Sequence, residues 1–337
     1  MFLYFVLAKK ICIFGRYIRI HKMSHFEIIK CHGSGNDFIL IDTTALEESQ
    51  RVDWSAFALE ACNRERGIGS DGLLLVVRGE DGCYGMDMIN PDGTHAEMCG
   101  NGMRAVARYC HERGYIAKEG CLTSGGRYFR VGKVEPIAYD IATYAVDIAI
   151  TTQSSAFAIK RPGETLVGEV IERLDPTLRF TALNLGNPHI VACVDSIDMS
   201  LLESLGNRVL ELEDILPEGV NISFYEVLSK NHIFVATYER GAGITLSCGT
   251  AMTASATAAA MLGYTESGER TAVTNRGGRV FCTPRIEESG IVTRLEGNAT
   301  FEWWGEASFE GGVLSFAKLR DSGEQEVWLR FVSEINR

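Results

Sequence analysis

The chain is patterned mainly for β-strands. Short runs of β-branched and aromatic residues recur along it, bounded by glycine, aspartate or asparagine, which is typical of strands between turns. These runs predict strands at FEIIK (26–30), FILID (38–42), LLLVV (73–77), YAVDIAI (144–150), HIVACV (189–194), HIFVATYE (232–239) and TRLEG (293–297).

Three segments have a helical pattern instead. After Cys99, apolar residues recur at helical spacing until Gly114, a residue suited to the stop of a helix. After Cys248, an Ala- and Thr-rich run of high helix propensity ends at Gly263. A third helix is predicted over residues 54–62. The small, apolar residues after Cys248 indicate a buried helix.

Many strands with one central helix in each half predict an α+β protein of two similar lobes. The segment EPIAYDIA interrupts the pattern near 135–145 and is the predicted boundary. We expect an N-terminal lobe over 23–140, a C-terminal lobe over 141–305, and a segment over 306–337 that returns to the N-terminal lobe.

The first 22 residues, MFLYFVLAKKICIFGRYIRIHK, are apolar and basic and contain no acid. A secretory signal carries its charge before its apolar core, and this segment does the reverse. We interpret residues 1–22 as an extension outside the fold, with the domain beginning near Met23. A basic helix lying on a membrane surface is the alternative.

Composition restricts the classes of function. The 337 residues are 46% hydrophobic and 23% charged, which is ordinary for a globular protein long enough for two domains. A net charge of −11 argues against a nucleic-acid surface, and no run reaches the roughly 18 apolar residues of a membrane helix. We therefore expect neither nucleic acid nor a membrane as a partner.

The ten cysteines are scattered, with no CxxC pair and no His/Cys cluster at zinc spacing. A disulfide framework does not suit this length, so reduced thiols in a cytoplasmic protein and no metal site are expected.

Two of these cysteines have matching surroundings. Cys99 and Cys248 each precede a glycine, a small or polar residue and then a predicted helix. A helix N-terminus lowers the pKa of a thiol, and a thiolate can act as a carbon base. Gly100, Gly102 and Gly249 leave backbone N–H groups open to a carboxylate. The pair predicts a site with one sulfur on each face of a substrate, as a two-base proton transfer requires.

Two other interpretations of the pair were weighed. Buried structural thiols are the usual role of a cysteine, and we keep that role for the other eight. A redox pair is the second, because thiols flanking one carbon can also form a disulfide, which we expect as an inactivating oxidation.

Six motifs in order resemble the diaminopimelate epimerase family. They are HGSGNDFILID (32–42), GIGSDGLLLV (67–76), NPDGTHAEMCGNGMRAVARY (90–109), LGNPHIV (185–191), VNISF (220–224) and ERGAGITLSCGTA (239–251). The resemblance extends from about Phe26 to the end of the chain.

This resemblance implies an isomerase that needs no cofactor, and in particular no pyridoxal phosphate. It interconverts L,L- and meso-2,6-diaminopimelate in lysine and peptidoglycan precursor synthesis, with Cys99 and Cys248 as the catalytic thiolate and thiol. The implied fold has two pseudo-symmetric lobes, each a mostly antiparallel sheet wrapped around a central helix. The family often dimerises, so a homodimer is an expectation.

Substrate contacts are carried over from the same motifs. Arg240 would hold the distal carboxylate, and amide carbonyls with Glu239 would accept from the distal ammonium. Donors at the two helix starts would hold the α-carboxylate. The assigned residues are Asn36, Asn90, Gly100, Asn101, Asn187, Asn221, Glu239, Arg240, Gly249 and Thr250.

Two histidines and two departures complete the resemblance. His32 is expected in a structural hydrogen bond, and for His189 a site role and a structural role stay equally open. Gly72 stands where the family commonly has glutamine, which would remove a side-chain contact. Ala251 replaces a glycine where the backbone could require a positive φ.

Two alternatives to the epimerase stay open. A related racemase of another amino acid, such as histidine, would leave Arg240 without a distal carboxylate, which is costly for a partly desolvated cation. An inactive amino-acid-binding homologue would tolerate loss of either thiol.

Overall fold

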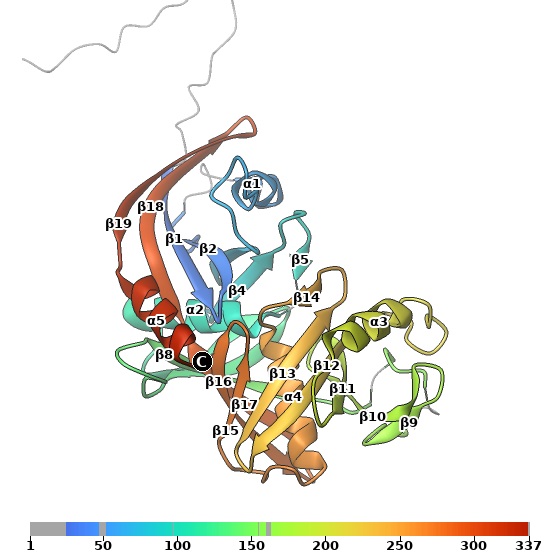
Figure 1. The fold of residues 1–337 in the computed structure, drawn as a ribbon. Coiled ribbons are helices and arrows are strands. Elements are labelled where there is room, and N and C mark those ends of the chain that lie inside the picture. The colour runs from blue at the N-terminus through green and yellow to red at the C-terminus, as the bar shows by residue number, and fades with distance from the viewer. Residues whose placement is uncertain (1–24, 47–51, 97, 154, 160–162, 336–337) are drawn as a thin grey trace, which may run out of the picture.

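A computed structural model describes residues 25–46, 52–96, 98–153, 155–159 and 163–335 of the protein. The expectations for residues 1–22 lie outside these ranges. The described part is a mixed α/β structure whose body is mainly sheet, with five helices packed against it (Figure 1).

All seven predicted strands are confirmed, and the sheet contains twelve more. The strands are β1 (His25–Gly33), β2 (Asn36–Asp42), β3 (Leu73–Arg78), β4 (Tyr84–Ile89), β5 (His95–Ala96), β6 (Glu119–Ser124), β7 (Arg127–Lys133), β8 (Thr143–Ile150), β9 (Glu169–Ile171), β10 (Asp175–Asn184), β11 (Pro188–Cys193), β12 (Asn221–Ser229), β13 (His232–Glu239), β14 (Gly243–Thr245), β15 (Thr271–Asn275), β16 (Gly278–Glu287), β17 (Gly290–Asn298), β18 (Thr300–Glu310) and β19 (Val313–Asp321).

Hydrogen bonds link these strands into one continuous ribbon. It runs through β19, β18, β1, β2, β3, β4, β6, β7 and β8, and then through β17, β16, β15, β13, β12, β11, β10 and β9. Most pairs are antiparallel. The pairing of β8 with β17 joins strands from the middle and last thirds of the chain, and β1 lies beside β18 (Figure 1).

The helices are α1 (Trp54–Ala61), α2 (Gly100–Glu112), α3 (Met199–Val209), α4 (Gly249–Met261) and α5 (Glu324–Ile335). The three predicted helices correspond to α1, α2 and α4. α3 and α5 were not predicted from the sequence. Each has apolar residues on one face, such as Leu202 and Leu205 in α3 and Trp328 and Phe331 in α5.

α2 and α4 begin and end in the same way. Cys99 and Cys248 are their N-cap residues, in extended backbone conformation. Both helices then stop at a glycine with positive φ, Gly114 at 76° and Gly263 at 76°. The N–H groups of each glycine and of the residue after it bond back to the last turn. These helix ends are Schellman motifs. They favour glycine because its missing Cβ permits a backbone of positive φ.

Both helices are buried. α4 is inaccessible along most of its length, and its Ala, Thr and Ser side chains let strands approach closely. The buried hydroxyls of Thr253 and Thr257 donate to the carbonyls of Gly249 and Thr253, each at 2.8 Å, so neither is left unpaired. One hydrophobic cluster packs around α2 and α4 together.

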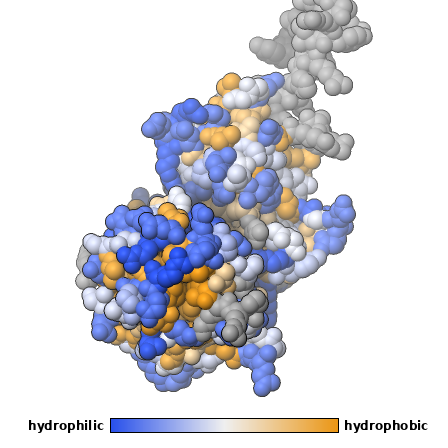
Figure 2. Space-filling view, turned by 90° about the vertical axis from the view of Figure 1, so that its right-hand side faces the viewer, coloured by the Kyte–Doolittle hydropathy of each residue, from blue (hydrophilic) through white to orange (hydrophobic). Residues whose placement is uncertain are grey.

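The surface is mixed in character. Hydrophilic residues cover much of the face seen in Figure 2, with apolar residues most dense on its lower part. No helix within the described ranges combines the length and apolarity that crossing a membrane requires.

α5 is attached to α2 through a buried guanidinium. Arg108 donates to both carboxylate oxygens of Glu324, at 2.6 and 2.7 Å, and its Cζ lies 4.0 Å from the ring centre of Phe301. Glu324 also accepts from the backbone N–H of Phe301 at 3.0 Å. This forked pair anchors the last helix against the sheet.

Replacing Glu324 with alanine should therefore destabilise the protein. Arg108 would keep its charge in a buried place with one partner fewer, so the free energy of unfolding should fall by about 1–3 kcal/mol after allowance for the partial exposure of Glu324. Urea denaturation measures this. Glu326→Ala, an exposed acid in the same turn, is the control, and an equal loss in both variants would contradict the role of the pair.

Candidate active site

The starts of α2 and α4 lie against each other. A Cβ placed on Gly249 would come within 2.9 Å of Asn101 Oδ1, so the first turns of the two helices are in close contact. Leu295 of β17 supports both turns, since its Cδ2 would lie 3.0 Å from a Cβ on Gly100 and 3.6 Å from one on Gly249. The fold thus brings together two cysteine-glycine segments that are far apart in the sequence.

Cys99 is half-buried at the start of α2. Its Sγ accepts from the Gly102 N–H at 3.5 Å and lies 3.8 Å from Asn36 Oδ1. Burial raises the pKa of the Cys99 thiol. The N–H groups of Gly102 and Asn101 and the charge of Arg104 act in the opposite direction, because each stabilises a thiolate.

Cys248 occupies the equivalent place on α4 and is 8% exposed. Burial raises the pKa of its thiol well above the usual value, and the nearby Glu239 carboxylate raises it further. The Thr250 hydroxyl, with its oxygen 3.3 Å from Cys248 Sγ, opposes this effect. The electrostatic surroundings of the two thiols therefore differ, with a cation near Cys99 and an acid near Cys248.

Glu239 lies at the end of β13, where it accepts from the Thr245 hydroxyl. Burial raises the pKa of this carboxyl. The sequence analysis assigned Glu239 to the distal ammonium of the substrate and missed its interaction with Cys248. No sequence spacing indicates that interaction, because it depends on how β13 and β14 approach α4.

Asn187, His189 and Thr250 form a hydrogen-bonded group beside Cys248. Asn187 Nδ2 donates to Thr250 Oγ1 at 3.2 Å, and His189 Nε2 lies 3.1 Å from both Asn187 Oδ1 and Thr250 Oγ1. Burial lowers the pKa of His189 to about 3, so its ring is neutral. A proton on Nε2 leaves the Thr250 hydroxyl free to donate to the sulfur of Cys248.

Asn221 and Arg240 lie together at the start of β12 and just after β13. Asn221 Oδ1 accepts from the Arg240 backbone N–H at 2.9 Å. The exposed guanidinium of Arg240 donates to the Glu218 carbonyl. Asn90 has a different setting, since its side chain donates to Thr94 Oγ1 at 3.0 Å within a turn after β4.

Asn36 and Asn101 connect the site to charged groups. Asn101 Nδ2 donates to Asn36 Oδ1 at 3.2 Å, and Asn36 Nδ2 donates to the Asp71 carboxylate at 2.8 Å. On its other side, Asn101 Oδ1 accepts from Arg104 at 2.9 Å. Arg104 was not selected from the sequence, although an arginine within the apolar pattern of a predicted helix was a usable signal.

His32 lies away from the thiols. Its Nε2 is 2.7 Å from Gln325 Oε1 of α5, and its Nδ1 accepts from the Gly35 N–H at 3.2 Å. Burial lowers the pKa of His32 to about 4. These contacts agree with the structural role expected for it.

The structure shows the surroundings of Ala251 and Gly72, the two departures from the family pattern. The expectation that Ala251 meets a backbone of positive φ is wrong, because Ala251 lies inside α4 and is fully buried. A Cβ on Gly72 would lie 3.1 Å from the Met88 side chain and 3.2 Å from the Ile89 carbonyl, so a larger residue requires Met88 to move.

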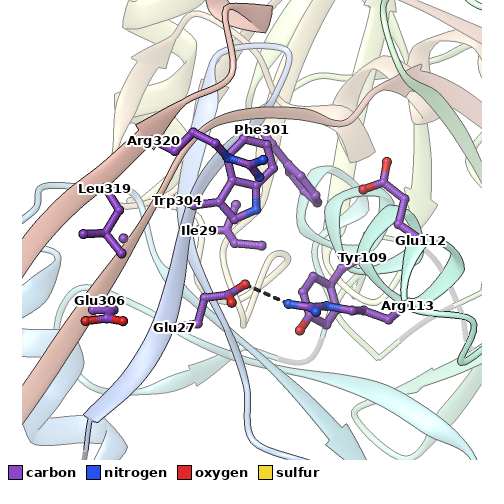
Figure 3. Close-up of a pocket in the computed structure, with 11 residues that line it drawn as sticks. Glu27, Ile29, Tyr109, Glu112, Arg113, Phe301, Trp304, Glu306, Leu319 and Arg320 are labelled. Carbon is purple, nitrogen blue, oxygen red and sulfur yellow. Dashed lines mark hydrogen bonds and ion pairs between the residues drawn. The ribbon is translucent and has the colours of Figure 1, made fainter.

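A cavity of about 480 Å³ lies elsewhere, between the C-terminal end of α2 and strands β1, β18 and β19 (Figure 3). Its lining includes Trp304, Arg320, Tyr109 and the ion pair of Glu27 with Arg113. None of the residues assigned to the site lines it. Within the described part of the chain, no group of three His, Cys, Asp or Glu side chains could hold a metal ion.

Solved structures share this fold. A PhzF-family phenazine biosynthesis protein of Bacillus anthracis superposes with a TM-score of 0.61 at 15% identity, covering 84% of this chain and 99% of that one. A hydroxyproline epimerase of Agrobacterium vitis gives 0.58 at 12% identity, covering 86% and 95%. The fold therefore defines a structural class that includes amino-acid epimerases.

Sequence comparison identifies the family within that class. The profile of diaminopimelate epimerase matches residues 28–128 and 181–302. A diaminopimelate epimerase of Listeria innocua is 36% identical over 327 residues, covering 94% of this chain and 98% of the relative. One of Enterococcus faecalis is 35% identical over 320 residues, covering 91% and 98%. The chain belongs to the diaminopimelate epimerase family.

The neutral, buried His189 makes stability depend on pH. Its pKa is lower in the folded protein than in the unfolded chain, so its contribution is complete above about pH 6.5 and is lost as the pH falls towards about 3. Between pH 6 and pH 4, the free energy of unfolding should fall by about 1 kcal/mol per pH unit more steeply in the wild type than in His189→Gln. Urea denaturation at several pH values measures both slopes.

His25→Gln, an exposed histidine at the start of β1, should retain the wild-type slope. Equal slopes for the wild type and His189→Gln would show that His189 does not take up its proton on unfolding.

Proposed function

We propose that this chain is a diaminopimelate epimerase, an isomerase that interconverts L,L- and meso-2,6-diaminopimelate by moving an α-proton between two thiols. The observation that carries the proposal is the pair Cys99 and Cys248 at two helix starts in mutual contact. Family membership over nearly the whole chain supports the choice of substrate.

The thiolate of one cysteine removes the α-proton, which breaks the Cα–H bond and forms an S–H bond. The electron pair left on the α-carbon delocalises into the α-carboxylate. The thiol of the other cysteine then delivers its proton to the opposite face of the carbon, which inverts it and leaves that cysteine as a thiolate. The two cysteines exchange roles when the reaction runs in reverse.

The helix starts stabilise the charge that develops on the α-carboxylate. Gly100 and Asn101 on α2, and Gly249 and Thr250 on α4, offer N–H groups at the positive ends of two helix dipoles. Donors that are held in place before the reaction stabilise a transition state with little reorganisation. The contact between the two turns supports a single carboxylate held by both.

The distal end of the substrate is assigned to Asn36, Asn90, Asn187, Asn221, Glu239 and Arg240. The exposed guanidinium of Arg240 is available to a distal carboxylate, and Asn221 orients its backbone. Glu239 lies near Cys248 as well as beside Arg240 in sequence. It can therefore accept from an ammonium while keeping Cys248 protonated.

The same proposal covers the organisation of the chain. It has an N-terminal lobe over 23–140 and a C-terminal lobe over 141–305, each with its sheet around one helix, and residues 306–337 belong to the first lobe. The pairing of β18 with β1, and of β19 with β18, supports that return. Closure of the lobes would exclude water and strengthen the thiolate as a base. The protein works as a cytoplasmic homodimer.

The decisive experiment follows α-proton exchange by NMR. With L,L-diaminopimelate in D2O, a thiol reductant and no added cofactor, the wild type should incorporate deuterium and form the meso isomer. Cys99→Ala and Cys248→Ala should each lose about a thousandfold in epimerisation, because each removes one of the two proton-transfer groups.

Cys121→Ala, which changes an exposed thiol, is the matched control and should keep full activity. A folded, reduced wild type that exchanges no proton would exclude this substrate and favour a racemase of another amino acid. Undiminished epimerisation in either site variant would exclude the two-thiol mechanism.

Replacing Arg240 with methionine should weaken recognition of the distal carboxylate. Losing a charge-assisted forked bond should lower kcat/KM by about 10- to 100-fold, mostly through KM, because the reacting carbon is not touched. Steady-state kinetics measure this, with Arg285→Met on the exposed part of β16 as the control. An unchanged KM would place the distal carboxylate elsewhere.

A further inference from the structure

Arg104 of α2 is a fully buried cation, and its hydrogen-bond acceptors among the described residues are all neutral. Its Nε donates to the Asn298 carbonyl at 3.2 Å, Nη1 to the Gly100 carbonyl at 3.2 Å, and Nη2 to Asn101 Oδ1 at 2.9 Å. None of these bonds reaches a carboxylate. Burial lowers the pKa of Arg104 to about 10, so it remains charged at neutral pH.

Two glycines leave space for the guanidinium of Arg104. A Cβ on Gly33 would lie 2.8 Å from its Nη2, and a Cβ on Gly297 would lie 2.9 Å from its Cζ. Two strands therefore carry glycine where they approach the group. Because the guanidinium cannot shift far in such a space, its orientation is closely defined.

Arg108, one turn later on α2, is a buried arginine that does have carboxylate partners. It is 6% exposed and pairs with the carboxylates of Glu324 and Glu112. A buried charge without such a partner costs several kcal/mol in general. The contrast indicates that Arg104 is balanced by a negative charge that forms only in the working site.

The bonds of Arg104 lead directly to Cys99. Holding Asn101 Oδ1 turns Asn101 Nδ2 towards Asn36 Oδ1, and this same oxygen accepts from the Cys99 thiol, at 3.8 Å, when that group is protonated. At its far end, Asn36 donates to Asp71. Both amides are thus oriented by a cation at one end and a carboxylate at the other.

The charged groups near Cys99 come from two elements. Arg104 on α2 favours a Cys99 thiolate, and Glu239 at the end of β13 opposes it. Arg104 itself faces the thiols of Cys99 and of Cys282 on β16. Burial raises the pKa of Cys282 to about 12, which leaves Cys99 as the anion that can balance the arginine.

We propose that Arg104 is a positioning residue, whose buried guanidinium orients Asn101 and supplies the positive charge that a thiolate at Cys99 balances. Cys99 is then the resting base, and Cys248 beside Glu239 is the resting thiol. The inference rests on the proposed function, because it assigns roles within the same two-thiol site.

The test measures the rate of iodoacetamide alkylation of Cys99 against pH, by peptide mass spectrometry, in the Cys248→Ala background. Arg104→Met should raise the apparent pKa of Cys99 by about 1–2 pH units, since a nearby cation is lost. Arg108→Met is the matched control, and it should lose stability without moving the pKa of Cys99.

A pKa of Cys99 unchanged by Arg104→Met would overturn the inference. If that variant does not fold, Arg104→Lys decides, since it keeps the cation without the fork. A wild-type Cys99 pKa in Arg104→Lys supports the role of the charge, and a raised pKa overturns it. In the protein with both thiols, Arg104→Met should slow proton exchange at pH 7 about tenfold or more and recover at higher pH, as the thiolate fraction does.

Alkylation needs no substrate, so the two proposals fail separately. Absence of exchange with diaminopimelate would remove the proposed function and leave the effect of Arg104 on Cys99 intact.

Discussion

One physical conflict governs this protein: a thiol must lose its proton in a place where burial opposes charge. Burial raises the pKa of both Cys99 and Cys248, yet proton abstraction from carbon requires a thiolate. The effect of burial is opposed by backbone N–H groups at the two helix starts and, near Cys99, by the charge of Arg104. Those donors lie at the N-terminal ends of α2 and α4, so their direction follows the axis of each helix.

The two helix starts meet against β17. β8 and β17 pair along their full length, and Leu295 on β17 supports the first turn of each helix. A Cβ at Gly100 would lie 3.0 Å from Leu295 Cδ2, and one at Gly249 would lie 2.9 Å from Asn101 Oδ1, so a larger residue requires these side chains to move. The small residues therefore allow the two helix turns to pack closely, in addition to leaving space for a ligand. The sheet fixes how the two turns, and with them the two cysteines, are placed.

Much of this was predictable from the sequence, for a physical reason. Strand alternation, helix caps and glycine stops are local signals, so seven of the strands and the helices α1, α2 and α4 were predicted correctly. α3 and α5 were missed because the strong strand signals and the two matched helices favoured an interpretation with fewer helices. The interaction of Glu239 with Cys248 and the isolation of Arg104 depend on contacts between distant segments, and Ala251 was misjudged because its backbone conformation was guessed from a glycine in relatives.

The position of β1 has a consequence for how the chain is made. β1 pairs with β2 on one side and with β18 on the other, and His32 at its end bonds Gln325 of α5. During synthesis, β1 leaves the ribosome long before β18. One edge of β1 therefore has no partner strand until β18 has been made. The N-terminal part of the protein cannot complete its sheet as a nascent chain. Translation that stops before residue 300 yields a polypeptide with an exposed strand edge, a product suited to capture by chaperones or to aggregation.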